Sequence, residues 1–262
     1  MRVCNLGSGS DGNLTYIETE NSKVLLDAGL SCLEITKRLA LLGVLPEQID
    51  AILITHEHSD HIKGLDVFAS KYKTKVYVHN NGYSAVVHKL KKEKDIQFVI
   101  FDDMDFYIND LKVTNFKLPH DSVYCCGYSF IEKTKKVSIL TDLGYTSSEV
   151  LSKIIGSTLV YLEANHDIEM LNNNPNYPLM LKKRILGRNG HLSNIASAEV
   201  IKHLAESGTK QVMLSHLSTE NNTPELAYNT ICEYLNKFGI EEGKHIKIAT
   251  TSVNPSFIFK ID

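Results

Sequence analysis

Residues 51–61 of the chain read AILITHEHSDH, an apolar run that ends in a cluster of histidines and acids. The apolar run predicts a β-strand, and open α/β sheets usually keep their sites at the carboxyl ends of their strands. In an extended segment His56 and His58 share one face, whereas Asp60 and His61 turn toward a second point. The segment therefore predicts two adjacent cation sites, and a solvated polar turn rich in histidine is the weaker interpretation.

Three later side chains follow predicted strands in the same way. They are His120 after residues 111–118, Asp142 after residues 137–141 and His216 after residues 211–215. Taken alone, each of them is more often an ordinary loop or core residue. All three stand at the strand ends where open α/β sheets usually keep their site residues.

The pattern HxHxDH of residues 56–61 resembles the signature of the metallo-β-lactamase-fold hydrolases. The resemblance implies a four-layer αββα sandwich, an α/β fold that binds two divalent cations. It assigns the ligands as follows: His56, His58 and His120 to one cation, Asp60, His61 and His216 to the other, and Asp142 as the bridge. Carboxylate and imidazole ligands suit zinc, manganese or iron. An aspartate at 142 with a histidine at 58 favours the phosphodiesterase and glyoxalase branches over antibiotic-degrading or redox enzymes.

Two further motifs, YLEANHD at residues 161–167 and GHLSN at residues 190–194, resemble paired motifs of RNase Z. In that enzyme the histidine approaches the scissile phosphate and the glutamate orients it, which implies catalytic roles for His191 and Glu163. A histidine at a helix entry can donate to an anion, and the free N–H groups of the helix add to the attraction.

The alternative for GHLSN is structural: Ser193 or Asn194 caps a helix and His191 is a solvated loop residue. We also expect His166 and Ser193 to bind substrate, although a polar turn from strand to helix explains His166 equally well.

Over nearly its whole length the chain resembles the YycJ family, also called WalJ, of metallo-β-lactamase-fold proteins. The segments that carry the resemblance are residues 6–13 (LGSGSDGN), 56–61, 119–121 (PHD), 141–145 (TDLGY), 163–167 (EANHD), 190–194 (GHLSN) and 214–218 (LSHLS). The family implies a metal-dependent DNA exonuclease that works in the 5′-to-3′ direction and is linked to DNA repair. In such a hydrolase a metal-bridging hydroxide is the nucleophile, Asp60 orients it, and the cations take up charge on the phosphate.

The remaining segments fit one α/β domain over residues 1–262. Apolar periodicity predicts helices at residues 32–42, 65–71, 147–155, 193–205 and 224–238, and strands at residues 1–6, 13–18 and 23–27. The glycine-rich residues 7–12 lack the lysine of a P-loop, so we expect a tight functional turn near the metals.

Charge is the main argument against a nucleic-acid substrate. Lys plus Arg total 28 and Asp plus Glu total 31, a net charge of −3, whereas proteins that neutralise phosphates are usually basic. However, residues 170–198 contain no acidic residue, and Tyr177 offers a ring on which a base can stack. Four cations lie in this segment: Lys182, Lys183, Arg184 and Arg188. We expect them to guide a DNA strand; an ordinary solvated face is the alternative.

The cysteines and the absence of long apolar runs bear on the compartment. Five scattered cysteines without a CxxC pair indicate reduced thiols in an intracellular protein. Neither a secretory leader nor an apolar run near 20 residues is present, so we expect a cytoplasmic protein without a membrane partner.

Three functional hypotheses remain open from the sequence. The first is the DNA exonuclease. The second is a metallo-hydrolase of small substrates, either a cyclic phosphodiesterase or a glyoxalase-type thioesterase, which the near-neutral charge would suit. The third, a metal-bound scaffold without turnover, is disfavoured by the complete ligand set.

Overall fold

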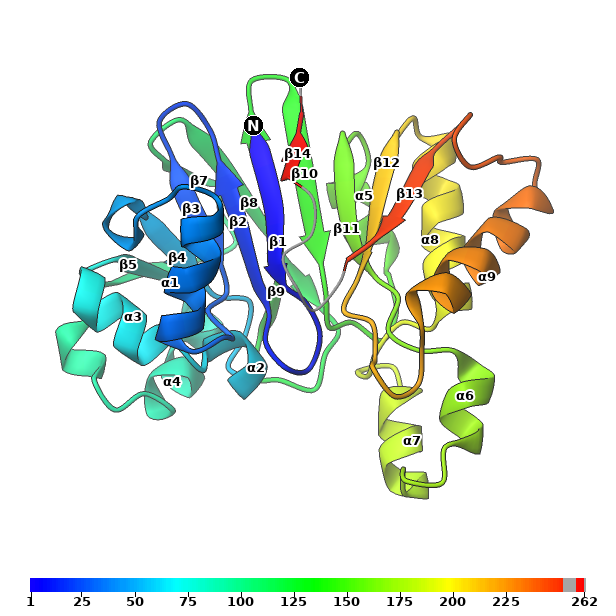
Figure 1. Ribbon diagram of the computed structural model, residues 1–262, viewed down its shortest axis with the longest axis horizontal. Coiled ribbons are helices and arrows are strands. Elements are labelled where there is room, and N and C mark those ends of the chain that lie inside the picture. The colour runs from blue at the N-terminus through cyan, green and yellow to red at the C-terminus, as the bar shows by residue number, and fades with distance from the viewer. Residues whose placement is uncertain (252–257, 262) are drawn as a thin grey trace.

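Two seven-stranded sheets lie face to face in the computed structural model, which describes residues 1–251 and 258–261 (Figure 1). The first sheet has the order β14-β1-β2-β3-β4-β5-β6, with β1 (Arg2–Gly7), β2 (Leu14–Glu18), β3 (Lys23–Leu26), β4 (Ala51–Leu53), β5 (Lys75–His79), β6 (Phe98–Phe101) and β14 (Ile258–Lys260). The second has the order β13-β12-β11-β10-β9-β8-β7, with β7 (Phe106–Ile108), β8 (Leu111–Leu118), β9 (Cys125–Glu132), β10 (Lys135–Leu140), β11 (Leu159–Glu163), β12 (Gln211–Ser215) and β13 (Lys247–Thr250).

The helices of the described residues are α1 (Cys32–Leu41), α2 (Ser59–Ile62), α3 (Leu65–Tyr72), α4 (Asn80–His88), α5 (Ser148–Ile154), α6 (Ile168–Asn173), α7 (Leu179–Ile185), α8 (Asn194–Glu206) and α9 (Pro224–Asn236), with 3₁₀ turns η1 (Pro46–Gln48) and η2 (Glu93–Asp95). Most of them cover the outer faces of the two sheets. In Figure 1, α1, α3 and α4 flank the first sheet, while α8 and α9 flank the second. The four-layer αββα sandwich predicted from the sequence is confirmed.

Strand alternation explains why three apolar cores separate the four layers. In β4, Ala51 and Leu53 point into the core between the two sheets, whereas Ile52 and the following Ile54 point into the core beneath the helices. A strand buried on both faces must be apolar at every position, as residues 51–54 are.

Strand direction determines the end of the sandwich at which the site lies. In the second sheet β10, β11 and β12 are parallel, and β8 runs the same way because both β8 and β10 pair antiparallel with β9. In the first sheet β3, β4 and β5 are also parallel. The carboxyl ends of these strands carry the predicted ligands.

The predicted helices match α1, α3, α5, α8 and α9 with ends that differ by one or two residues. The sequence analysis did not identify α4, α6 or α7. Helices α6 and α7 form an arm (residues 168–185) that projects beyond the second sheet (Figure 1). Within the described residues, none of the helices combines the length and the apolar content needed to cross a membrane.

Candidate metal centre

The HEHSDH segment forms a bend that is held from behind by backbone hydrogen bonds. Asn13 N–H donates to the carbonyl of Asp60 (2.7 Å), and Ala28 N–H donates to the carbonyl of His61 (2.8 Å). Gly29 lies so close that a Cβ there would be 1.6 Å from the carbonyl oxygen of Asp60. The close approach therefore requires glycine, and it fixes the bend before any cation binds.

All seven predicted ligands meet at this end of the sandwich. Within each of three groups the donor atoms lie within 4.8 Å of one another: His56 with His58 and His120, Asp60 with His61 and His216, and Asp142 with His56 and His61. Asp142 also belongs to a fourth such group, with His216, Glu163 and His191, and its Oδ1 is 3.5 Å from Nε2 of His216. The first two groups coincide with the two predicted sites, and Asp142 lies between them.

The donor set fits divalent cations. Nε2 of His56 and Nε2 of His216 are buried and make no hydrogen bond within the described residues. Burying a polar atom without a partner costs free energy, so buried imidazole nitrogens without a hydrogen bond are expected where a metal binds. Imidazole and carboxylate donors in this number suit zinc or manganese.

Three residues of the site adopt left-handed backbone conformations that non-glycine residues rarely adopt. Asp27, Asp142 and His216, each just after a strand, have φ values of 62°, 64° and 56°. Such conformations cost about 1–2 kcal/mol each and cluster at functional sites. The turn directs each side chain inward at the strand end.

Before cations bind, ionised carboxylates and protonated histidines balance one another in the site. Burial opposes ionisation of Asp142, but the charges of His216 and His61 outweigh burial and hold the pKa of Asp142 well below its usual range. Conversely, burial disfavours protonated His216, yet Asp142, Asp60 and Glu163 raise the pKa of His216 to about 10. The buried carboxylates therefore require positive charge beside them, which divalent cations would supply.

Two buried carboxylates orient ligands from behind. Oδ2 of Asp27 is 2.7 Å from Nδ1 of His61, and Oε1 of Glu163 is 2.7 Å from Nδ1 of His216. Each contact leaves Nε2 of the histidine facing the site, as is usual for metal-bound imidazoles.

Sequence reasoning missed Asp27 and the supporting role of Glu57. Asp27 follows β3 in the same strand-end position that identified the other acids, so that signal was available. Glu57 accepts from Val123 N–H (2.9 Å), which ties the HEHSDH bend to the loop of His120.

The glycine-rich turn lies beside the metal centre as predicted. Ser8 Oγ accepts from His216 N–H (2.7 Å). Asn13 Nδ2 lies 3.2 Å from Oδ2 of Asp60 and 3.0 Å from Nε2 of His61. The turn thus supports three ligands.

His191 is held in the site and is not a solvated loop residue. Its Nδ1 is 2.8 Å from Oε1 of Glu163 and 3.6 Å from Oδ1 of Asp142, and its side chain is 21% exposed. Burial lowers the pKa of His191, but Glu163 and Asp142 outweigh burial and raise it. Its ring borders a pocket, which fits a group that contacts substrate.

The other two candidate substrate residues near this motif are a helix cap and a buried histidine whose ring nitrogens make no hydrogen bond within the described residues. Ser193 is the N-cap of α8, and its hydroxyl accepts from Ala196 N–H (3.2 Å), as the capping alternative predicts. His166 is only 1% exposed, and burial lowers its pKa to about 4. This geometry gives no support to substrate contact by either side chain.

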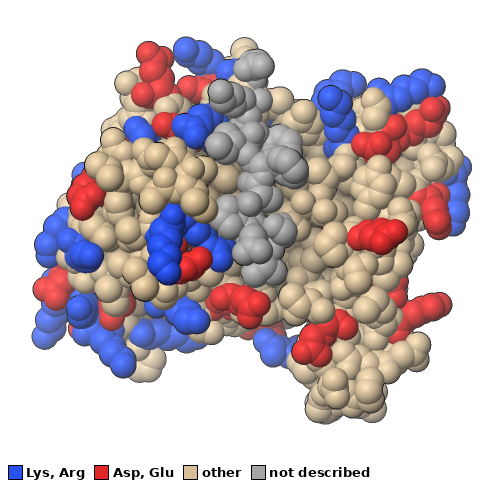
Figure 2. Space-filling view, viewed as in Figure 1, with Lys and Arg blue, Asp and Glu red and all other residues tan. Residues whose placement is uncertain are grey.

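The four basic residues have different surroundings. Lys182 Nζ donates to the carbonyl of Asn172 (2.7 Å), Arg184 pairs with Asp121, and Arg188 stacks over the ring of Tyr145 at 4.7 Å. Lys183 is exposed. On the face shown in Figure 2, blue side chains gather over the helices of the first sheet and the arm shows none. Their contact with DNA stays a prediction.

Comparisons with known proteins agree with this geometry. Residues 22–217 match the family model described as a beta-lactamase superfamily domain. The chain is 40% identical over 250 residues to exodeoxyribonuclease WalJ of Streptococcus pneumoniae serotype 2 (strain D39 / NCTC 7466), covering 94% of this chain and 93% of that protein. It is 36% identical over 249 residues to exodeoxyribonuclease YycJ of Bacillus anthracis, with the same coverage. The metallo-beta-lactamase fold protein YhfI from Bacillus subtilis superposes with a TM-score of 0.75 at 15% identity over 98% of both chains.

Proposed function

The chain belongs to the YycJ/WalJ family of metallo-β-lactamase-fold hydrolases, and on that premise we propose that it is a binuclear metal-dependent phosphodiesterase, a 5′-to-3′ DNA exonuclease. The observation that carries the hydrolase assignment is the convergence of seven histidine and aspartate donors, with orphaned ring nitrogens, at the carboxyl ends of the strands. The choice of DNA rests on relatives that are named exodeoxyribonucleases.

The ligand set supports the proposed cofactor. His56, His58 and His120 would hold one cation, Asp60, His61 and His216 the other, and Asp142 both. Bound there, two divalent cations, zinc or manganese with iron as a further candidate, would supply a hydroxide nucleophile at neutral pH and neutralise charge on the phosphate. Asp60 is the ligand placed to orient the attacking oxygen, because Asn13 holds its carboxylate from the side.

In this proposal His191 contacts the substrate and Glu163 orients His191. Since Glu163 engages Nδ1 of His191, Nε2 is the ring nitrogen that remains for a substrate. A protonated imidazole there would donate to a phosphate oxygen or to the leaving oxygen. Glu163 does not touch the substrate in this proposal; it orients His191 and keeps it protonated.

We propose that residues 1–262 form one domain. We also propose that the protein acts in the cytoplasm and takes part in DNA repair. The inter-sheet core is shared by strands from both halves of the chain, which supports a single folding unit. The five cysteines form no disulfide within the described residues, which is consistent with a reducing compartment.

A small-substrate hydrolase is the alternative, and one observation favours it. The pocket beside His191 has a volume of about 180 Å³, which would admit one small ligand. A cyclic phosphodiester or a glyoxalase-type thioester would then occupy the site, and no nucleic-acid strand would be needed.

The deciding experiment offers the metal-loaded protein equimolar end-labelled single-stranded DNA, RNA of the same sequence, bis(4-nitrophenyl) phosphate and a cyclic nucleotide. We expect DNA to shorten stepwise from its 5′ end, and Asp142→Asn to abolish this. Asp95→Asn, a change of the same kind in exposed η2, should behave as the unmodified protein.

The outcomes separate the hypotheses. Release of mononucleotides from the 3′ end would overturn the polarity alone. Hydrolysis of the cyclic nucleotide with intact DNA would favour the small-substrate enzyme. No turnover of any substrate at full metal content would favour the scaffold.

A further inference from the structure

Two pockets flank the loop that carries His120. The arm pocket, about 180 Å³, lies beneath the α6–α7 arm and is bordered by Ser10, Asn165, Tyr177, Leu181, His191 and Asn221. The strand pocket, about 410 Å³, is bordered by His120 itself and by Lys117, Ser122, Tyr124, Tyr145 and Asn189. The loop of His120 therefore borders both pockets, the smaller one through Asp121 and the larger one through His120.

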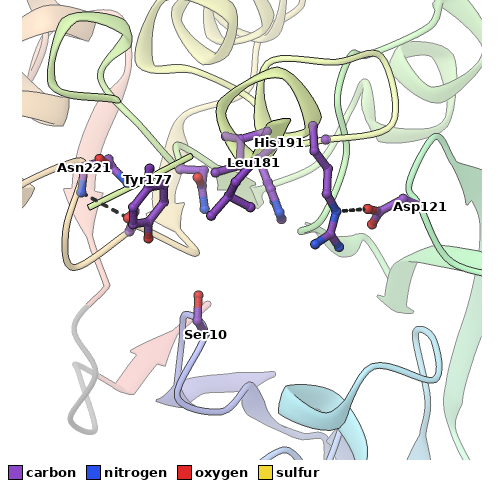
Figure 3. A pocket seen from close by; sticks show the side chains of 11 residues that line it. Ser10, Asp121, Tyr177, Leu181, His191 and Asn221 are labelled. Atoms are coloured by element: carbon purple, nitrogen blue, oxygen red, sulfur yellow. Dashed lines mark hydrogen bonds and ion pairs between the residues drawn. The ribbon is translucent and has the colours of Figure 1, made fainter. Parts of the chain in front are cut away.

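The arm pocket has a ring surface and neutral polar groups on opposite sides. Figure 3 shows Tyr177, Leu181, His191 and Asn221 on one side and Ser10, from the β1–β2 turn, facing them. Asn174 Nδ2 donates to Oδ1 of Asn221 (2.8 Å), which fixes the arm against the loop after β12. The pocket thus has a fixed shape formed by segments distant in the sequence.

The hydrogen-bonding groups of the arm pocket include both donors and acceptors. Asn165 Nδ2 donates to the carbonyl of His216 (3.0 Å), so Oδ1 of Asn165 remains an acceptor. Asn221 uses Oδ1 within the protein, so its Nδ2 remains a donor. Phosphate oxygens only accept, whereas the edge of a nucleobase both donates and accepts.

Charge also argues against a phosphate in the arm pocket. Apart from His191, its charged residues are Arg184 and Asp121, and these two form an ion pair with each other (Figure 3). An arginine already paired with a carboxylate attracts a second anion weakly. The volume is also below the roughly 300–1,000 Å³ typical of sites for drug-sized ligands, so it fits one ring system.

The strand pocket has the opposite character. The lining residue Lys117 has its Nζ 5.4 Å from the ring centre of Tyr124, and Arg188, which precedes the lining residue Asn189, has its guanidinium 4.7 Å from the ring centre of Tyr145. Glu149 is the acidic residue on the same lining. Cations beside aromatic rings suit a strand that has both phosphates and bases.

We propose that the arm pocket holds the base of the terminal nucleotide, stacked on Tyr177, and that the strand pocket holds the nucleotides that follow. The scissile phosphodiester then lies at the metal centre between them, and the arm sets the cut one nucleotide from the end. This inference rests on the proposed DNase activity and deepens it, because it assigns the subsite that makes the enzyme an exonuclease.

The test uses DNA oligonucleotides whose terminal residue, at the 5′ or the 3′ end, lacks its base. For the end that is attacked, we expect release of the first residue to slow about 5- to 100-fold when the base is missing, the range expected for one lost stack. Tyr177→Ala should slow release from the ordinary end by a similar factor and should no longer distinguish the two oligonucleotides. Tyr177→Phe, which keeps the ring, should retain the distinction.

A second variant tests the pocket by filling it. Leu181→Trp should also remove the preference for a terminal base, because the indole would occupy the space of the base. Leu179→Trp is the matched control: it makes the same change on the same helix at a side chain that is 66% exposed and does not border the pocket. Metal content and the unfolding midpoint establish that each variant is folded.

Each outcome has one meaning. Equal release from ordinary and base-free ends by the unmodified protein would overturn the pocket assignment while leaving the exonuclease intact. A Tyr177→Ala protein that still distinguishes the ends would do the same. Hydrolysis of bis(4-nitrophenyl) phosphate without cleavage of ordinary DNA would refute the proposed function itself, and this inference with it.

Discussion

One carboxylate oxygen of Glu163 serves two histidines that we assign to different tasks. Oε1 is 2.7 Å from Nδ1 of His216, a proposed metal ligand, and 2.8 Å from Nδ1 of His191, the proposed substrate contact. His191 and His216 lower the pKa of Glu163 to about 2 in spite of its burial, so it is ionised at neutral pH. The metal centre and the substrate histidine are therefore coupled through one side chain.

Replacing His191 separates chemistry from metal binding. His191→Ala should retain the metal content but lower turnover of phosphodiesters about 10²-fold or more, because an acid or an anion-stabilising donor is lost. Elemental analysis and initial rates measure the two quantities. His203→Ala, at a half-exposed position of α8, is the control. Unchanged turnover would leave His191 with no catalytic role.

Replacing Glu163 should affect both tasks. Glu163→Gln removes the charge behind His216 and His191, so we expect metal affinity to fall by about 10- to 100-fold, as for other carboxylates behind metal-bound histidines. Turnover should stay low even at saturating metal, because His191 is also released. Metal titration of the chelator-treated protein, compared with exposed Glu199→Gln on α8, measures this. Normal metal affinity would contradict the supporting role.

Replacing Asp142 tests the number of cations. Its carboxylate lies near donors of both groups, so Asp142→Ala should lower the metal content from two per chain and abolish turnover. Elemental analysis with Asp95→Ala as the control checks the prediction. Full metal content together with full activity would rule out the bridge.

At the scale of elements, the arm and the turn after it give the four basic residues different partners. Arg184 is paired with Asp121 and Lys182 with a backbone carbonyl, whereas Lys183 is exposed and Arg188 lies over Tyr145 beside the strand pocket. We therefore expect Lys183 and Arg188 to contribute most of the attraction of this segment for DNA.

The double change Lys183→Gln and Arg188→Gln should weaken DNA binding and flatten its salt dependence. Each lost phosphate contact should reduce the slope of log K against log salt by about 0.7–0.9. Binding titrations at several salt concentrations measure the slope, and Lys182→Gln is the control on the same helix. An unchanged slope would show that these residues do not contact phosphate.

At the scale of the whole molecule, cations at the centre would join the two sheets. Ligands of both sheets meet there: residues 56–61 follow β4 of the first, and His120, Asp142 and His216 follow strands of the second. Without cations, the carboxylates of this centre depend on protonated histidines.

Metal removal should therefore destabilise the fold. A ligand at 1,000 times its Kd stabilises by about 4 kcal/mol, which corresponds to roughly 10 °C in Tm for a chain of this size. Thermal unfolding with and without chelator measures the difference, and added zinc or manganese should restore it. A Tm that does not respond to chelator would contradict binding at the junction of the sheets.

Local patterns in the sequence determined the α/β class and placed most of the ligands at strand ends, and the resemblance of the HxHxDH motif implied the four-layer sandwich and the ligand assignment. The apolar run of residues 51–54 and the acids and histidines that follow strands are short-range properties, because strand direction alone brings carboxyl ends to one edge. Asp27 obeys the same rule and could have been found in this way. Tertiary structure alone decided which distant groups face one another: Glu163 with two histidines, Arg184 with Asp121, and Tyr177 opposite Ser10. Such contacts depend on how loops of different strands approach in space, and spacing along the chain carries no record of that.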